Sequence, residues 1–242
     1  MKVVFVHGAL VFDGAWWWHR MVEPLAAFGL GTRAVELPSC IGPPEASVEA
    51  AGDMYDDADA VRSALDEEDE PVVLVGHSYG GMLITDAAAD HENVVHLVYV
   101  TSVMPEPGET LASFGGPGEP GPWMDPRPEE GTMGLKAELV PEVFMQDCDD
   151  EAVEGALERL TRQPLSVFGQ APRAVAWRQR PSTYVVCAED RGTPPDAQRE
   201  FARRAGTVVE LPTGHHPMLS QPRLLARVLA EAAAAQGGMP KA

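Results

Sequence analysis

The sequence predicts an α/β fold: a doubly wound, mostly parallel sheet of six strands with an inserted cap. Three observations predict it. Short valine-rich runs alternate with segments of helical periodicity, which is the pattern of parallel strands joined by helices. One of these runs passes directly into a glycine-framed serine and then into a helix. A proline- and glycine-rich stretch separates the fourth run from the fifth.

Six apolar runs are expected to form the strands, because strands buried on both faces are continuously hydrophobic. They cover residues 2–6, 32–37, 72–75, 94–100, 182–187 and 207–211. Helices are expected over residues 15–28, 47–65, 82–89 and 223–235, and between Thr193 and Gly206. Pro24 should kink or break the first helix, and Ser47 should cap the second.

The 242 residues are expected to form one globular domain whose core is interrupted by the cap. Residues 1–104 and 176–242 are assigned to the core, and residues 105–175 to the cap. Proline and glycine are frequent at the start of this insertion, and helical patterns resume only after it. An insertion of this kind between two core strands is typical of a cover over a site.

The composition excludes several classes of partner. A net charge of -19 and a pI near 4.6 would repel nucleic acid and anionic membranes, so neither is expected, and a small-molecule substrate remains. The three cysteines lack metal-type spacing, so we expect neither a disulfide framework nor a zinc site. The histidines show no H-E-x-x-H or comparable ligand spacing, so no metal is expected, and the predicted chemistry needs no cofactor. With no leader-like or membrane-spanning run, a cytoplasmic location is expected. The oligomeric state is left open, with a homodimer as one option.

A serine framed by glycines follows the third apolar run, in the sequence Gly76-His77-Ser78-Tyr79-Gly80. A serine hydroxyl is a weak nucleophile, so acyl chemistry needs it on an exposed turn with a base and an oxyanion site in reach. A Gly-x-Ser-x-Gly pattern between a buried strand and a helix supplies such a turn, because glycines permit the tight backbone. Ser78 is therefore the candidate nucleophile.

Two further chemical groups follow later strands. Asp190 comes after the fifth run and His215 after the sixth. The carboxyl ends of parallel strands meet at one edge of the sheet, where open α/β sheets place their sites. The chain order Ser, Asp, His is found in only one of the well-known serine hydrolase arrangements. The residue pattern alone leaves Glu189 open as the acid, and His216 or His7 as the base.

At these positions the chain resembles the α/β-hydrolase superfamily, and within it the small group of plant methylesterases, hydroxynitrile lyases and many bacterial esterases. The matching segments are FVHGA (residues 5–9), GAW (14–16), VGHSYGG (75–81), YVVCAEDRGTP (184–194) and GHHPMLSQP (214–222). The resemblance implies an esterase-type fold with a modest cap, Asp190 as the acid and His215 as the base. It also implies an oxyanion hole formed by the backbone N–H groups of Ala9 and Tyr79.

The sequence departs from the family pattern in two places. The loop after Gly8 is lengthened, so residues 10–13 are expected to reshape the oxyanion loop. Hydroxynitrile lyases carry threonine where this chain has Gly8 and lysine where it has His216. Cyanohydrin cleavage is therefore disfavoured.

The walls of an apolar substrate pocket are predicted from six side chains: Leu10, Phe12, Trp123, Phe144, Phe168 and Met218. The alternative interpretation is that each of these side chains packs in the protein interior and does not face a pocket. Of the run Trp16, Trp17 and Trp18, at least one should lie in the core, because successive helical residues face different ways.

The sequence thus predicts a serine hydrolase that cleaves a small or medium apolar carboxylic ester through an acyl-enzyme. One alternative keeps the triad but applies it to a lactone or thioester, or to a lyase or cyclase step of secondary metabolism. An alternative of another class is a non-catalytic receptor for a small ligand on a hydrolase fold.

Overall fold

The computed structural model describes residues 1–40, 42–43, 51–114 and 121–237. Its main sheet contains β1 (Lys2–Val6), β2 (Gly31–Val35), β3 (Val72–His77), β4 (Val94–Val100), β8 (Ser182–Cys187) and β9 (Thr207–Leu211). The strand order is β2-β1-β3-β4-β8-β9, and every neighbouring pair is parallel. The predicted fold class is confirmed, and β1, β4, β8 and β9 have the predicted bounds.

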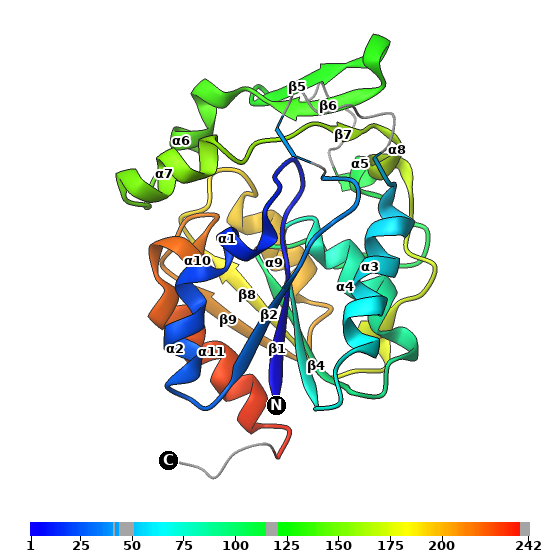
Figure 1. The fold of residues 1–242 in the computed structure, drawn as a ribbon, viewed down its shortest axis with the longest axis vertical. Coiled ribbons are helices and arrows are strands. Elements are labelled where there is room, and N and C mark those ends of the chain that lie inside the picture. The colour runs from blue at the N-terminus through cyan, green and yellow to red at the C-terminus, as the bar shows by residue number, and fades with distance from the viewer. Residues whose placement is uncertain (41, 44–50, 115–120, 238–242) are drawn as a thin grey trace.

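Helices cover both faces of this sheet (Figure 1), which explains the unbroken valine runs. Successive side chains of a strand point to opposite faces, so Val3 and Phe5 of β1 pack in one apolar cluster while Val4 and Val6 pack in the other. On the first face lie α2 (Val22–Ala26), α10 (Pro217–Ser220) and α11 (Pro222–Ala234). On the second lie α3 (Met54–Asp66), α4 (Gly80–Ala87) and α9 (Pro195–Ala202).

The first predicted helix is broken at a different place from the one expected. Residues 14–26 form α1 (Gly14–Trp17), a 3-10 turn (His19–Met21) and α2, so the break falls at Trp18. Pro24 lies in the first turn of α2, where a backbone N–H has no partner within the helix to lose. The proline therefore does not interrupt the helix.

The second predicted helix begins later than its apolar periodicity indicates. Asp53 caps α3 by accepting the N–H groups of Tyr55 and Asp56, while the Asp56 carboxylate accepts the Asp53 N–H. The predicted cap, Ser47, lies outside the described residues, and Asp53 is the cap that the structure has. Periodicity alone does not mark where a helix starts.

Between β4 and β8 the chain forms short elements above the carboxyl ends of the sheet strands, at the top of Figure 1. They are α5 (Leu111–Phe114), β5 (Met124–Arg127), β6 (Thr132–Leu135), α6 (Val140–Val143), α7 (Asp150–Leu157), β7 (Gln163–Pro164) and α8 (Ser166–Gly169). The strands β5, β6 and β7 form an antiparallel sheet that the sequence did not predict. The buried Arg162 side chain bonds Asp125 and Thr132 and ties this sheet together.

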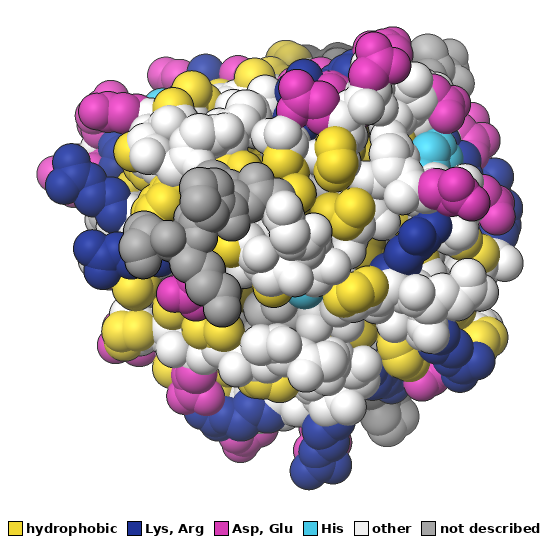
Figure 2. All heavy atoms as spheres, turned by 90° about the horizontal axis from the view of Figure 1, so that it is seen from below, with side chains coloured by type: hydrophobic (Ala, Val, Ile, Leu, Met, Phe, Trp, Pro, Cys, Tyr) yellow, Lys and Arg dark blue, Asp and Glu magenta, His cyan; other side chains and the backbone are white. Residues whose placement is uncertain are grey.

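The surface carries charges of both signs. On the face in Figure 2, Lys and Arg side chains are interspersed with Asp and Glu around the rim, and hydrophobic side chains lie between them. The net charge of -19 is therefore not gathered into one acidic patch on this face. Among the described residues, none of the helices is long and apolar enough to span a bilayer.

Candidate active site

Ser78 stands on the turn between β3 and α4 in a left-handed backbone conformation, with φ of 52°. Non-glycine residues rarely adopt this conformation, which costs about 1 kcal/mol or more, so surrounding contacts must hold it. The Ser78 N–H donates to the Val100 carbonyl at 3.3 Å, and the Ser102 hydroxyl donates to the Ser78 carbonyl at 2.5 Å. These bonds fix the serine at the edge of the sheet.

The two glycines that frame Ser78 have no room for a side chain. A Cβ on Gly76 would lie 2.7 Å from the Gly80 carbonyl oxygen, and one on Gly80 would lie 2.6 Å from the Val6 carbonyl oxygen. Both contacts are with backbone, which cannot swing aside. The turn thus depends on glycine at both positions.

Gly80→Ala is expected to lower the free energy of unfolding by about 1–3 kcal/mol, because the new methyl group overpacks the strand–helix contact. Gly169→Ala is the matched control, since a Cβ there meets nothing within 4 Å. Urea unfolding followed by circular dichroism measures both. Equal midpoints for the two variants would show that the turn tolerates a side chain.

Asp190 and His215 meet at the carboxyl ends of the sheet strands, where Ser78 also lies. The Asp190 Oδ2 and His215 Nδ1 atoms are 2.7 Å apart, and both side chains are buried. Thr101 donates its hydroxyl to the same oxygen at 2.5 Å, and the N–H groups of Gly192 and Thr193 donate to Oδ1 at 2.8 and 2.9 Å. The carboxylate is therefore surrounded by donors.

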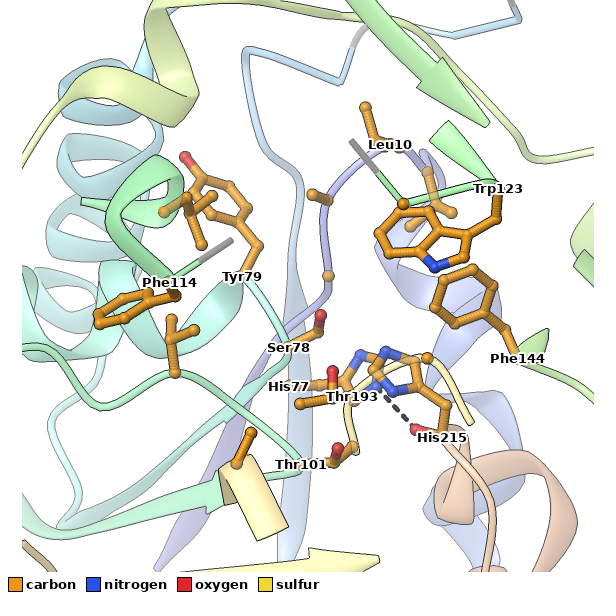
Figure 3. A pocket seen from close by; sticks show the side chains of 18 of the residues that line it. Leu10, His77, Ser78, Tyr79, Thr101, Phe114, Trp123, Phe144, Thr193 and His215 are labelled. Carbon is orange, nitrogen blue, oxygen red and sulfur yellow. Dashed lines mark hydrogen bonds between the residues drawn. The ribbon is translucent and has the colours of Figure 1, made fainter. Parts of the chain in front are cut away.

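These donors keep Asp190 ionised. Burial acts to raise the pKa of Asp190, but His215 and the hydrogen bonds from Thr101 and Thr193 outweigh it and hold this pKa below its ordinary value. An ionised Asp190 fixes the tautomer of His215 with the proton on Nδ1, which leaves Nε2 free as an acceptor. Ser78 and His215 line the same cavity (Figure 3).

The alternative acid and bases take no part in the carboxylate–imidazole pair. The hydrogen-bond partner of His215 Nδ1 is Asp190, the residue after Glu189, and His216 Nδ1 bonds the Phe144 carbonyl at 3.0 Å. His7 Nδ1 bonds the adjacent Gly8 carbonyl at 2.9 Å, in the turn of the loop after β1. The structure thus pairs Asp190 with His215, whereas His216, which lies beside His215, is held by a backbone carbonyl and not by a carboxylate.

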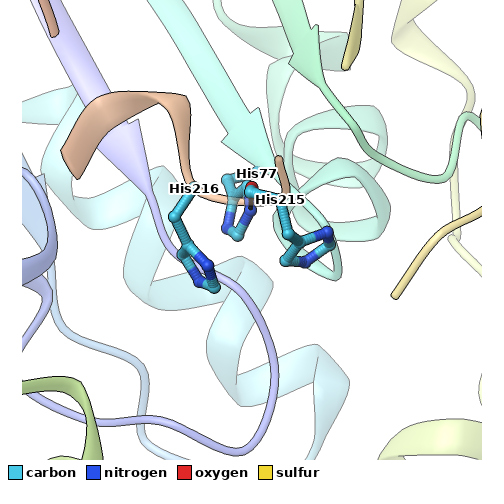
Figure 4. A group of neighbouring side chains, drawn as sticks. All are labelled: His77, His215 and His216. Atoms are coloured by element: carbon cyan, nitrogen blue, oxygen red, sulfur yellow. Dashed lines mark hydrogen bonds between the residues drawn. The ribbon is translucent and has the colours of Figure 1, made fainter. Parts of the chain in front are cut away.

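Three buried histidines form a triangle that sequence spacing could not reveal. The ring centroids of His77, His215 and His216 are 4.7 to 4.9 Å apart (Figure 4), and each offers a nitrogen within 4.8 Å of the others. Burial lowers the pKa of His77 far below its ordinary value and that of His216 to about 3, so both are neutral. His77 Nε2 bonds the His215 carbonyl at 2.9 Å and thereby supports the His215 loop.

The predicted oxyanion donors lie beside Ser78. Ala9 and Tyr79 both line the cavity. In the part of the chain that the structure describes, no partner is recorded for the backbone N–H of either residue. The next N–H along the loop, that of Leu10, donates instead to the Gln163 side chain at 2.7 Å. Among the described residues, the two N–H groups that the resemblance implies therefore differ from that of Leu10 in having no protein acceptor.

A cavity of about 780 Å³ surrounds Ser78. Four of the six predicted wall residues line it: Leu10, Trp123, Phe144 and Phe168. The prediction for Phe12 and Met218 was wrong. Phe12 packs half-buried against the apolar cluster under α3 and α4, and Met218 in α10 points into the core on the opposite face of the sheet.

The cavity extends to both sides of Ser78. Phe114 lies on one side, and Trp123 with Phe144 on the other (Figure 3). Phe114 and Trp17 are wall residues that the sequence did not assign, because nothing in local periodicity shows which apolar side chains face a cavity. Trp17 and Trp18 are also buried in the core, as expected for at least one residue of the tryptophan run.

The chain matches the sequence profile of the alpha/beta hydrolase family over residues 3–228. Together with the parallel sheet and the turn at Ser78, this match shows that the chain belongs to the alpha/beta hydrolase family.

Three known proteins are similar to this chain over most of its length. Alpha/beta hydrolase nvfD of Aspergillus novofumigatus is 31% identical over 216 residues, which are 83% of this chain and 84% of the relative. Methylesterase 8 of Arabidopsis thaliana is 28% identical over 237 residues, or 92% and 85% of the two chains. The crystal structure of a pyrethroid hydrolase from Sphingobium faniae is 28% identical, with a TM-score of 0.85 and 99% of each chain covered. The resemblance to this esterase group is confirmed.

Proposed function

We propose that the protein is a serine carboxylic ester hydrolase that cleaves apolar esters through an acyl-enzyme on Ser78. The observation that carries this proposal is the 2.7 Å hydrogen bond between Asp190 and His215, at the wall of a cavity that also contains Ser78. The names of the relatives, a methylesterase and a pyrethroid hydrolase, support the same type of reaction.

In the first half of the reaction, the Ser78 hydroxyl attacks the ester carbonyl carbon while His215 Nε2 takes its proton. His215 then returns this proton to the leaving alcohol, and the acyl group stays on Ser78. In the second half, His215 deprotonates a water molecule that attacks the acyl carbon. The proton returns to Ser78 Oγ as the acid is released. Asp190 stabilises the imidazolium that forms in each half.

The tetrahedral intermediates place a negative charge on the former carbonyl oxygen. We assign the backbone N–H groups of Ala9 and Tyr79 as the donors that stabilise it. Loss of one such donor typically raises the barrier by about 3 kcal/mol. Backbone donors of this kind cannot be removed by side-chain substitution, so their position is what a mutation can disturb.

The substrate is proposed to be apolar in both its acyl and its alcohol part. Aromatic and aliphatic side chains make up most of the cavity walls, and the charged residues among them, Glu109, Glu200 and Arg204, include the Arg204–Glu109 ion pair. A volume of about 780 Å³ is that of a site for a medium-sized molecule. We further propose that residues 105–175 act as the cap, since Trp123, Phe144 and Phe168 come from this segment. Specificity would then be set mainly by the cap.

A series of p-nitrophenyl esters tests the proposed function. Acetate, butyrate and octanoate esters should all be hydrolysed, with KM falling along the series, because each buried methylene contributes about 0.8 kcal/mol to binding. The p-nitrophenyl ester of succinic acid, which carries a carboxylate, is the matched polar substrate and should be a poor one. No hydrolysis of any member, or a preference for the charged ester, would contradict the proposal.

A further inference from the structure

A buried chain of hydrogen bonds joins the two sides of the proposed oxyanion hole. The Tyr79 hydroxyl donates to Asp57 Oδ2 at 2.7 Å, and the Ser39 hydroxyl donates to the same oxygen at 2.5 Å. The Gln163 side-chain NH₂ donates to Ser39 Oγ at 2.6 Å, and its Oε1 accepts the Leu10 N–H at 2.7 Å. The four residues whose side chains form these hydrogen bonds are each at most 1% exposed: Ser39, Asp57, Tyr79 and Gln163.

The direction of every bond in this chain is fixed. The Leu10 N–H can only donate, so Gln163 presents Oε1 to it and directs its NH₂ group at Ser39. Ser39 Oγ thus accepts from Gln163 and gives its own proton to Asp57. The Asp57 carboxylate also accepts the Ser39 backbone N–H at 2.8 Å. Burial raises the pKa of Asp57 to about 6, although the hydrogen bonds from Ser39 and Tyr79 act to lower it. Above that pH Asp57 is ionised and accepts the hydrogen bonds from both Ser39 and Tyr79.

The hydrogen-bond chain ends at the Tyr79 hydroxyl on one side and at the Leu10 N–H on the other. Tyr79 comes directly after Ser78, and Leu10 directly after Ala9. Leu10 has φ of 64°, which a non-glycine residue adopts only when its surroundings hold it. Its N–H is bound by Gln163, and its carbonyl accepts the Thr161 N–H at 2.9 Å. The segment around residues 161–163 therefore fixes the lengthened oxyanion loop.

We propose that Asp57, Ser39 and Gln163 are positioning residues that hold the Ala9 and Tyr79 N–H groups at the spacing required to bind the oxyanion. This inference rests on the proposed function. Asp57 comes from α3, Ser39 from the loop after β2, and Gln163 from the insertion between β4 and β8. The insertion thus supports the reacting centre as well as lining the cavity.

Two pairs of matched variants test the inference. Tyr79→Phe removes only the hydroxyl bonded to Asp57, and its control Tyr99→Phe removes the buried hydroxyl bonded to Thr85 at 2.8 Å. Gln163→Leu removes the link from Leu10 to Ser39. Its control Gln170→Leu removes a side chain that likewise joins a backbone N–H, that of Met54, to a side-chain oxygen, that of Asp53.

Tyr79→Phe and Gln163→Leu are each expected to lower kcat by about tenfold to a hundredfold with KM unchanged, since small misplacements of catalytic groups have effects of this size. Binding of a trifluoromethyl ketone, whose adduct with Ser78 carries an oxyanion, should weaken by a similar factor. The controls should keep wild-type kcat even if they unfold at lower temperature. If Tyr79→Phe and Gln163→Leu differ from the wild-type protein in thermal stability alone, the hydrogen-bond chain has a purely structural role.

The inference is overturned if Tyr79→Phe and Gln163→Leu match their controls in kcat and in ketone binding. It is also overturned if the loss appears in KM alone. An inactive wild-type protein would instead overturn the proposed ester hydrolase function, so the two failures are distinguishable.

Discussion

Replacing Ser78 with alanine is expected to lower kcat for ester hydrolysis on the order of 10⁶-fold, because the acyl-enzyme then has no oxygen on which to form. Alanine meets the same backbone conformation at φ of 52° as serine does, so the strain of the turn does not change. The variant should therefore fold, and KM or ligand binding should remain close to the wild-type value. Steady-state hydrolysis of p-nitrophenyl butyrate measures the loss.

Ser63→Ala is the control for this substitution. Ser63 lies on α3, and its hydroxyl donates to the Asp59 carbonyl one turn earlier, at 2.9 Å. This variant should hydrolyse the ester at the wild-type rate. If Ser78→Ala retained a rate comparable to that of Ser63→Ala, Ser78 would not be the nucleophile.

His215→Ala is expected to abolish the acylation step, whereas His216→Ala should leave most of it. Only His215 has its Nδ1 held by a carboxylate, which orients the ring and stabilises its protonated form. His216 bonds a backbone carbonyl instead, and burial lowers its pKa to about 3, so it is a poor proton acceptor at neutral pH. The burst of p-nitrophenol in a stopped-flow experiment reports acylation directly. For His215→Ala a loss on the order of 10⁶-fold is expected.

His216 packs among aromatic rings, with its centroid 5.0 Å from that of Trp17, so alanine leaves a hole there. His216→Gln fills more of this space and separates a packing effect from a chemical one. Both His216 variants should show the burst. A burst that survives in His215→Ala and is lost in His216→Gln would reverse the assignment of the base.

The sheet could be predicted from sequence because its signal is local. The runs that became β1, β4 and β8 are buried almost throughout, so their continuous hydrophobicity delimits them without knowledge of their neighbours. The edge strand β9 is largely exposed, and its run is delimited by Gly206 and Pro212 on either side. The sheet formed by β5, β6 and β7 could not. Its strands are short, and both Pro126 and Pro164 lie within them, so neither alternation nor length distinguishes them from loop.

The positions of Ser78, Asp190 and His215 could be predicted because each follows a strand whose end lies at one edge of a parallel sheet. Their buried partners could not. Gln163 bonds Leu10 from 153 residues away, and Thr101 reaches Asp190 from 89 residues away. Such contacts depend on how the insertion and the loops fold back on the sheet, and no pattern within either segment indicates them.

Covalent labelling with a fluorophosphonate tests the central claim most directly, because the reagent reacts with an activated serine even when the natural substrate is unknown. The wild-type protein should gain one phosphonyl group, mapped by peptide mass spectrometry to Ser78. His215→Ala should label far more slowly. If Ser78 is labelled but the protein hydrolyses none of the esters, we would infer that Ser78, His215 and Asp190 act on another kind of acyl substrate. A wild-type protein that remains unlabelled, or that is labelled elsewhere, would contradict the assignment of Ser78 as the nucleophile.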